Sequence, residues 1–300
     1  MSIDKMAGKA ATERIWSHTV GIANRALAET GKDPVTGLKA YESEKPGTGM
    51  AGTWGGQYFV QTAKHVVEQA EPRNLRFFVR QVGELQVKHA SELVVTDGVA
   101  AIELNDPDAV IHRCEWEDLA IITMRPNALG PNLEFFDVEN SWVDAAEGQI
   151  VSGIGYPLSS SVRFPKRVGS VPEQAVLLSP MPFNGSVLPI SVGDELKFKF
   201  SGFDAERHFL IPYEHAEKGM RPEGISGAGV WVEAEKPQVI WTASFKFAGI
   251  CTSCYRGAVE QIVKASAVRK FLTEVFGTEG LAISRRMPHP SRSLRRGGDF

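Results

Sequence analysis

The sequence predicts an all-β protein with two lobes of similar build, followed by one C-terminal helix. Residues 45 to 143 hold short runs of aromatic and β-branched residues separated by turns, and residues 148 to 255 repeat that texture without repeating its sequence. Beyond Ala258 the apolar residues recur at helical spacing instead, and Gly277 is the expected stop. A chain of 300 residues, 43% of them hydrophobic, can bury the core that one large domain or two small ones need.

The N-terminal part favours a helix. Residues 9 to 29 carry helix formers, a turn-forming stretch at residues 31 to 34 ends the pattern, and the apolar positions are Ile15, Val20, Ile22, Ala23 and Leu27. We expect this helix to pack on the body of the protein, with a partner-binding element as the alternative. Residues 1 to 44 are therefore interpreted as an N-terminal helical extension.

The remaining boundaries follow from the same patterns. We expect the first lobe over residues 45 to 147, the second over residues 148 to 256 and the C-terminal helix over residues 257 to 277. Residues 278 to 300 are basic, contain prolines and lack periodicity, so we expect a disordered tail. Docking of this tail to an anionic surface is the alternative.

Composition argues against several classes of function. With 33 basic and 36 acidic residues, the net charge of −3 gives no electrostatic attraction to nucleic acid. No apolar run approaches the ~20 residues that cross a bilayer, and the first residues lack a signal-peptide core, so we expect a cytoplasmic protein without membrane contact. Only three cysteines occur, which argues against a disulfide-rich secreted protein.

Two features could suggest a metal or redox site, and neither is sufficient. Cys251 and Cys254 have the spacing of a metal-binding or redox pair, but no second ligand pair or strand-to-helix redox context accompanies them. His208 and His215 do not form a zinc motif either. We therefore expect no metal and no cofactor.

Three short motifs, far apart in the sequence, supply the parts of a nucleophilic site. His65 follows the expected strand at residues 57 to 63, Asp118 leads directly into an apolar strand, and Ser226 lies in a glycine-rich turn. Serine is a weak nucleophile at neutral pH, so it needs a general base and a group that orients that base. Glycines around Ser226 allow backbone amides to converge on one point, as an oxyanion hole requires.

Five motifs together resemble the trypsin-like (chymotrypsin-fold) serine peptidases, especially the bacterial branch with the HtrA and glutamyl-endopeptidase groups. The resemblance covers about residues 45 to 276 and implies two antiparallel β-barrels, each mainly of six strands. The motifs are Gly47-Thr48-Gly49, Thr62-Ala63-Lys64-His65, Asp118-Leu119-Ala120, the glycine-containing segment 148 to 157 and Gly224-Ile225-Ser226-Gly227.

Matched residue by residue, the resemblance implies a general base at His65, an orienting carboxylate at Asp118 and a nucleophile at Ser226. The amides of Gly224 and Ser226 would form the oxyanion hole. The implied activity is that of a serine endopeptidase, which hydrolyses a peptide or protein substrate through an acyl-enzyme intermediate.

The resemblance also implies a substrate groove. Residues 248 to 254 are similar to the strand that lines it, so Thr252, Ser253 and Cys254 are expected there, with Thr252 where a hydroxyl supports the aspartate. Met220 falls at the base of the specificity pocket. Its flexible apolar side chain predicts a preference for uncharged, small or medium apolar residues on the acyl side of the scissile bond.

Ile225 departs from the family pattern. Secreted digestive members carry an aspartate there that binds a newly cut N-terminus, so activation by that ion pair is not expected. Glycines within residues 219 to 229 lower the cost of switching this loop, and we expect restraint through loop order, narrow substrate choice or an activating protein partner. Two alternatives remain open: a catalytically silent peptide-binding module of the same fold, and a non-peptide esterase.

Overall fold

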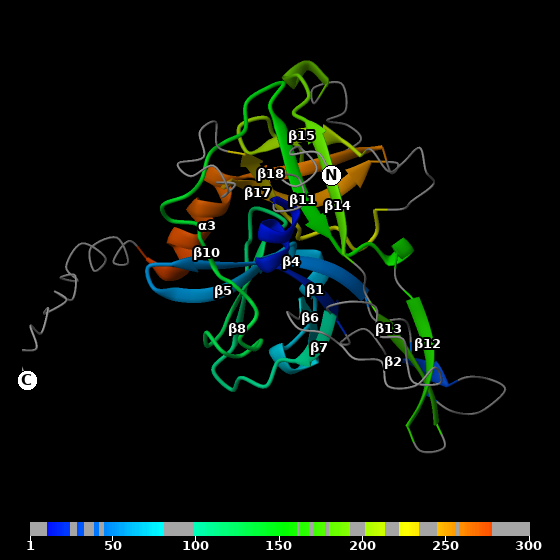
Figure 1. Cartoon of the computed structure of the whole chain (residues 1–300). Helices are drawn as coiled ribbons and strands as arrows, with labels where there is room; N and C mark the ends of the chain where they lie inside the picture. Colours follow the sequence, from blue (N-terminus) through cyan, green and yellow to red (C-terminus); the bar gives the residue numbers. More distant parts are fainter. Residues whose placement is uncertain are drawn as a thin grey trace, which may run out of the picture.

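The computed structural model describes residues 11–24, 29–32, 39–41, 45–80, 99–160, 162–168, 171–177, 180–192, 202–213, 222–233, 245–255 and 258–277. Figure 1 shows two sheet-built lobes, one above the other, with a helix beside their junction. Among the helices in these ranges, none is long and apolar enough to cross a membrane.

The first lobe is a sheet with eight described strands around one core. The strand order is β7-β6-β1-β4-β5-β9-β8, with antiparallel neighbours throughout, and β10 adds a short parallel pairing to β4. The bounds are β1 (Thr19–Asn24), β4 (Lys45–Trp54), β5 (Gln57–Thr62), β6 (Leu75–Arg80), β7 (Val99–Glu103), β8 (Val110–Arg113), β9 (Ala120–Thr123) and β10 (Phe136–Asp137).

A tight hairpin sets the register in this lobe. Gly55 and Gly56 connect β4 to β5 with φ values of 55° and 80°, the pair of positive φ angles that a two-residue type I′ turn requires. The resulting register puts Gly49 opposite Thr62, so the end of β5 lies beside the middle of β4.

The second lobe is a six-stranded antiparallel sheet among the described residues. Its order is β14-β11-β16-β17-β18-β15, and Leu188, just past β14, donates its backbone N–H to the carbonyl of Leu210 in β15 over 2.8 Å. This bond joins the two ends of the order and closes the barrel. The bounds are β11 (Ile150–Gly155), β14 (Met181–Ser186), β15 (His208–Pro212), β16 (Gly229–Glu233), β17 (Phe245–Tyr255) and β18 (Val259–Lys264).

A shared apolar cluster joins the lobes and the C-terminal helix. Met50 and Leu119 from the first lobe pack with Trp231 from the second and with Phe271 of α3 (Ala265–Phe276). Burial of each such large side chain contributes about 1.5–3 kcal/mol.

Gly277, with φ of 74°, ends the helix as expected. The expected start of this helix at residue 257 is wrong, because Val259–Lys264 form the buried strand β18 between β15 and β17. The second barrel therefore extends beyond residue 256, and the helix begins at Ala265.

Small hairpins and single turns complete the described chain. Two separate two-stranded sheets pair β2 with β3 and β12 with β13. The bounds of these and of the 3-10 turns are β2 (Glu29–Lys32), β3 (Lys39–Tyr41), β12 (Val162–Val168), β13 (Val171–Leu177), η1 (Lys64–Val67), η2 (Pro72–Asn74) and η3 (Leu158–Ser160).

The expected N-terminal helix over residues 9 to 29 is wrong beyond residue 17. Helical residues 11–17 are followed by β1, in which all six residues are buried because the strand packs on both faces. Gly21 lets this strand approach Tyr156, since a Cβ there would lie 3.0 Å from the tyrosine Cγ. The first sheet therefore begins at Thr19 rather than at residue 45, and it has eight described strands rather than six.

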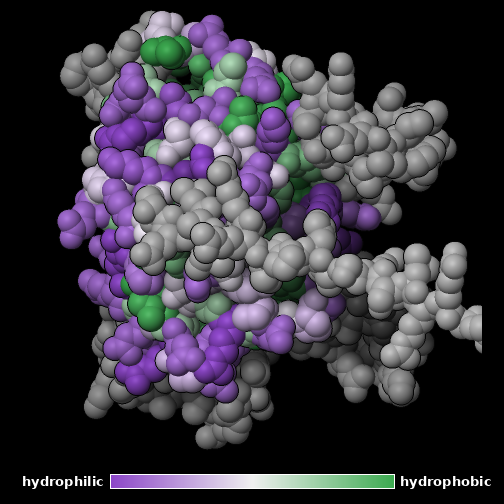
Figure 2. Space-filling view, turned by 90° about the vertical axis from the view of Figure 1, so that its left-hand side faces the viewer, coloured by the Kyte–Doolittle hydropathy of each residue, from purple (hydrophilic) through white to green (hydrophobic). Residues whose placement is uncertain are grey.

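The surface offers no broad apolar face in the view of Figure 2, where hydrophilic residues dominate and hydrophobic ones form small separate spots. Val110, Ile150 and Ile190 are the exposed large hydrophobic residues among those described. Isolated exposed apolar residues are normal for a globular protein. The expected tail at residues 278 to 300 lies outside the described residues.

Candidate active site

Neighbouring strands bring His65 and Asp118 together. His65 lies in η1 directly after β5, Asp118 lies just before β9, and Thr62 of β5 faces Ala120 of β9. The Nδ1 atom of His65 is 2.7 Å from Oδ2 of Asp118, and Oδ1 of Asp118 accepts the backbone N–H of His65 over 3.0 Å. An ionised carboxylate at Nδ1 selects the Nδ1–H tautomer, which leaves Nε2 as the basic nitrogen of the imidazole.

The environment keeps Asp118 ionised. Burial by itself raises the pKa of this carboxyl, but the hydrogen bonds and charge of His65 outweigh burial and hold the pKa below its ordinary value. Both side chains remain partly exposed, at 37% for His65 and 33% for Asp118, so the pair borders solvent rather than the core. A substrate can therefore reach the imidazole.

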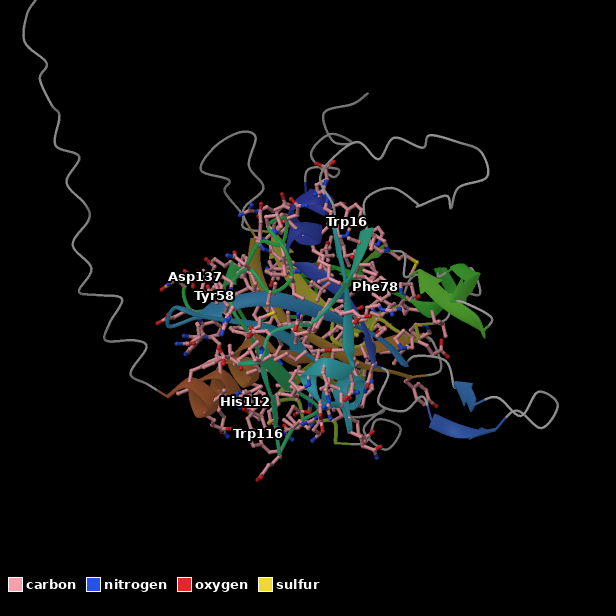
Figure 3. The ribbon with its side chains drawn as sticks, turned by 90° about the horizontal axis from the view of Figure 1, so that it is seen from below. Trp16, Tyr58, Phe78, His112, Trp116 and Asp137 are labelled. Carbon is pink, nitrogen blue, oxygen red and sulfur yellow. The ribbon has the colours of Figure 1, made fainter. Side chains whose placement is uncertain are left out.

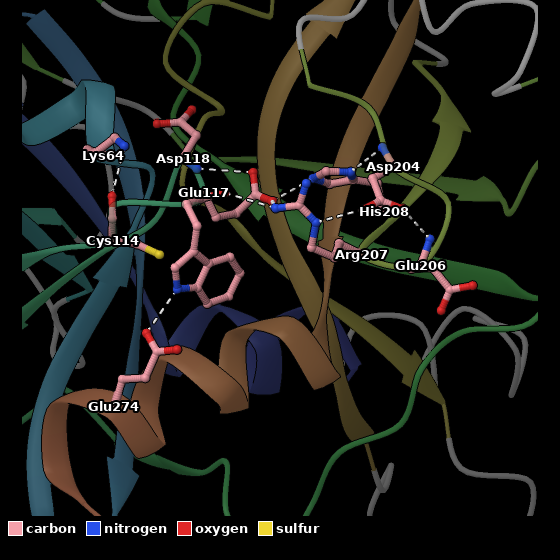
Figure 4. Close-up of polar contacts among 10 residues, drawn as sticks. Lys64, Cys114, Glu117, Asp118, Asp204, Glu206, Arg207, His208 and Glu274 are labelled. Carbon is pink, nitrogen blue, oxygen red and sulfur yellow. Dashed lines mark hydrogen bonds and ion pairs between the residues drawn. The ribbon is translucent and has the colours of Figure 1, made fainter.

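A second carboxylate–imidazole contact lies beside Asp118 and joins Glu117 of the first lobe to His208 of the second (Figure 4). Glu117 accepts the backbone N–H of Asp118 at Oε1 over 3.1 Å, while its Oε2 lies 2.9 Å from Nη1 of Arg207 and 3.0 Å from Nε2 of His208. The Nδ1 atom of His208 accepts the backbone N–H of Asp204 over 2.9 Å. That bond leaves the proton of neutral His208 on Nε2, facing Glu117.

The contacts of Glu117 connect the two lobes beside Asp118. The Glu117 side chain is only 8% exposed, and burial alone raises its pKa, but hydrogen bonding to His208 and nearby positive charge leave the pKa lowered. Arg207 also donates to the carbonyl of Trp116 over 2.9 Å. Figure 3 shows Trp116 and His112 on the opposite side of the first lobe from Trp16.

The turn that carries Ser226 is packed against the end of β5. Gly224 and Gly227 have φ values of 100° and 94°, which favour glycine. A Cβ on Gly227 would lie 1.9 Å from the carbonyl oxygen of Thr48 and 2.3 Å from Oγ1 of Thr62, so no other residue fits. Thr62 ends β5, the strand that leads to His65, so the Ser226 turn lies beside the end of that strand.

Backbone bonding in this turn leaves two amides available. The carbonyls of Glu223 and Ile225 accept the amides of Leu158 and Ala228 over 2.6 and 2.9 Å. Because a trans peptide points its N–H opposite to its C=O, the amides of Gly224 and Ser226 point away from those partners. Neither of these two amides, nor the Ser226 hydroxyl, forms a hydrogen bond with another described residue. Catalytic hydrogen bonds often tighten only when substrate binds.

The expected groove residues follow the Ser226 turn in β17. Cys251 accepts the amide of Gly227 over 2.6 Å and donates to Ala228 over 2.9 Å, which places Thr252, Ser253 and Cys254 next along the strand. Ser253 and Cys254 are partly exposed, as groove residues must be. Met220 lies outside the described residues.

Thr252 does not take the expected position. This residue lies at a bulge between Cys251 and Ser253, is buried, and directs its hydroxyl toward the carbonyl of Gln261 over 3.5 Å rather than toward Asp118. The bulge turns the side chain into the space between strands β17 and β18. Glu117 instead supports Asp118, through the aspartate backbone.

Sequence reasoning missed Glu117 and the role of Thr48. An acidic residue next to a candidate aspartate carries no local signal, because its partners lie 90 positions away in the other lobe. Thr48 lies within a recognised glycine motif, but only the fold shows what it contacts. The described residues contain no group of three or more His, Cys, Asp or Glu side chains arranged to hold a metal ion.

No family model matches this chain, and no curated protein matches it. Among solved structures, an inactivated protease paralogue of the scabies mite is similar, with a TM-score of 0.52 and 12% identity over 89% of this chain and 94% of that one. The human heparin binding protein is similar over 88% of this chain and 93% of that one, with a TM-score of 0.47 and 10% identity.

Identities of this size support conclusions about the fold alone. The two antiparallel sheet-built lobes, the helix packed at their junction and the likeness to the mite paralogue agree on one architecture. The chain has the chymotrypsin-like double β-barrel fold.

Proposed function

We propose that this protein is a serine endopeptidase, with His65, Asp118 and Ser226 as its catalytic residues. The proposal is supported by the 2.7 Å contact between His65 Nδ1 and Asp118 Oδ2. It is also supported by the packing of the Ser226 turn against Thr62, the last residue of the strand that leads to His65. A carboxylate-oriented imidazole has one evident use beside a serine in a glycine-rich turn, which is to remove the serine proton.

In the proposed mechanism, Ser226 Oγ attacks the substrate carbonyl while His65 Nε2 takes the hydroxyl proton. The amides of Gly224 and Ser226 stabilise the oxyanion, a contribution of about 3–4 kcal/mol for one such donor. His65 then protonates the leaving amine, and water hydrolyses the acyl-enzyme by the reverse sequence. Asp118 stays ionised throughout and keeps the imidazole in the productive tautomer.

A peptide or protein is the proposed substrate, lying along Ser253 and Cys254. Met220 at the pocket base, and with it the preference for uncharged apolar residues, stays a prediction of the sequence. The likeness to the bacterial branch also stays a prediction of the sequence. So does a cytoplasmic location, which agrees with three cysteines that form no disulfide. An activating protein partner remains a separate proposal, tested by adding host protein to the purified chain.

A catalytically silent peptide-binding module is the second candidate, because a similar fold belongs to an inactivated protease paralogue. The intact set of His65, Asp118 and Ser226 favours catalysis over this alternative. A non-peptide esterase would use the same residues and differ only in what it hydrolyses.

Hydrolysis assays separate the three functions. Purified protein, Ser226→Ala and the control Ser266→Ala, a serine in the first turn of α3, are compared on an unfolded protein, a fluorogenic peptide library and simple esters. We expect peptide cleavage that Ser226→Ala abolishes and Ser266→Ala retains. Ester cleavage alone would favour the esterase, and peptide binding without any cleavage would favour the silent module.

A further inference from the structure

One buried threonine connects three segments at the Ser226 turn. Thr48 in β4 donates its backbone N–H to the carbonyl of Ser226 over 2.8 Å, and its own carbonyl accepts the hydroxyl of Thr62 over 2.6 Å. The hydroxyl of Thr48 donates to the carbonyl of Gly224 over 2.7 Å and accepts the amide of Tyr156 over 2.9 Å. Thr48 is fully buried, so its N–H, carbonyl and hydroxyl form their hydrogen bonds with protein groups rather than with water.

The hydroxyl of Thr48 fixes the orientation of one peptide plane in this turn. The plane between Gly224 and Ile225 is held at one end by this hydroxyl and at the other by the bond from Ile225 N to the carbonyl of Pro222, 2.9 Å. Neighbouring planes are held by backbone groups alone. Since this plane lies between the two amides left available, its orientation determines whether they converge.

Ile225 shows why such a group is needed. Its side chain is buried and packs against Gly155, where a Cβ would lie 2.9 Å from the isoleucine Cγ1. An apolar side chain there fills space but fixes no peptide plane, because it forms no hydrogen bond. The Thr48 hydroxyl supplies that directional bond from the other lobe, and it ties the turn to Tyr156 at the end of the segment that Ile225 contacts.

We infer that Thr48 is a positioning residue that holds the oxyanion amides of the Ser226 turn in their competent arrangement, an inference that rests on the proposed function. The hydroxyl acts within the resting chain, so the competent turn needs neither a cut N-terminus nor a bound ion. The hydroxyl uses its proton and one of its two lone pairs in these bonds.

Thr48→Val tests this role because valine keeps the shape and both backbone bonds but removes the hydroxyl. The variant leaves two buried polar groups without a partner, on Gly224 and Tyr156. We expect kcat and the rate of fluorophosphonate labelling to fall about 10- to 100-fold, with KM changed less than about threefold. Thr48→Ser restores the hydroxyl and should restore most of the labelling rate.

Thr19→Val is the matched control, because Thr19 is equally buried in the same lobe and its hydroxyl makes one bond, to Ile15 O over 2.8 Å. We expect this control to lower the melting temperature while kcat stays near that of the parent protein. If Thr48→Val labels as fast as the control at equal folded fraction, the inference is overturned.

Hydrogen exchange keeps the inference testable if the parent protein never labels, an outcome that defeats the proposed function instead. The amides of Ile225 and Gly227 should exchange about tenfold faster in Thr48→Val than in Thr19→Val, because the turn opens locally. Equal exchange in the two variants would overturn the positioning role of Thr48 without reference to catalysis.

Discussion

Glu260 should make the stability of this protein fall as the pH rises. Its carboxyl is buried in the second barrel, where Oε2 lies 2.7 Å from the sulfur of Cys251. Burial raises the pKa of Glu260 from 4.5 to about 7, although contacts with Cys251 and Cys254 oppose the rise. Burial likewise raises the pKa of the Cys251 thiol, which therefore stays protonated across this range.

The direction of the change in stability with pH depends on whether the folded or the unfolded state binds the Glu260 proton more tightly. Between pH 4.5 and about 7 the unfolded chain has already released the Glu260 proton while the folded protein retains it, so the free energy of unfolding declines. A shift of this size corresponds to about 3 kcal/mol in total, and most of it falls between roughly pH 5 and pH 8. The contribution is complete below the unfolded pKa and lost above the folded one.

Urea unfolding of the parent protein and Glu260→Gln, measured at several pH values from 5 to 8, isolates this effect. Glutamine keeps the shape of the side chain and cannot titrate, so other groups cancel in the difference between the two proteins. We expect Glu260→Gln to become the relatively more stable protein as the pH rises. A difference that stays constant with pH would refute the assignment of a raised pKa to Glu260.

Asp118→Asn should lower kcat by roughly three to four orders of magnitude, because an amide favours the wrong tautomer of His65, and circular dichroism should show an unchanged fold. Arg207→Met leaves the Glu117 carboxylate buried with fewer partners and should cost about 2–4 kcal/mol of unfolding free energy in urea titrations, whereas an unchanged midpoint would contradict the connection between the lobes. A peptide library should be cut mainly after uncharged apolar residues, and cleavage mainly after lysine or arginine would contradict the pocket assigned to Met220.

Local sequence patterns predicted strands rich in aromatic and β-branched residues, and turns marked by glycine. The strand expected at residues 57 to 63 corresponds to β5, and the helix stop expected at Gly277 is the end of α3. The start of that helix was placed too early, because the apolar residues of β18 (Val259–Lys264) are buried in a sheet and also fit a helical period. His65 and Asp118 could be paired in advance because each lies at the end of a strand, and strands that pair bring their ends together.

Contacts between distant segments explain what the sequence did not reveal. Residues 19 to 24 resembled one face of a helix, but they are buried on both faces, and Gly21 meets Tyr156 from the other lobe. The Thr48 hydroxyl and Gly224 are 176 positions apart, so no local pattern relates them. Thr252 turns away from Asp118 because of a bulge, which shifts the strand register without a sequence mark of its own.

If Ser226 is an activated nucleophile, it should react stoichiometrically with a serine-directed reagent. Purified parent protein is treated with a fluorophosphonate, and the modified residue is located by mass spectrometry of its peptides. We expect one label per chain on Ser226, which is lost in Ser226→Ala and forms much more slowly in Asp118→Asn. Absence of label on Ser226 in folded protein, or equal labelling of several serines, would contradict the activation of Ser226.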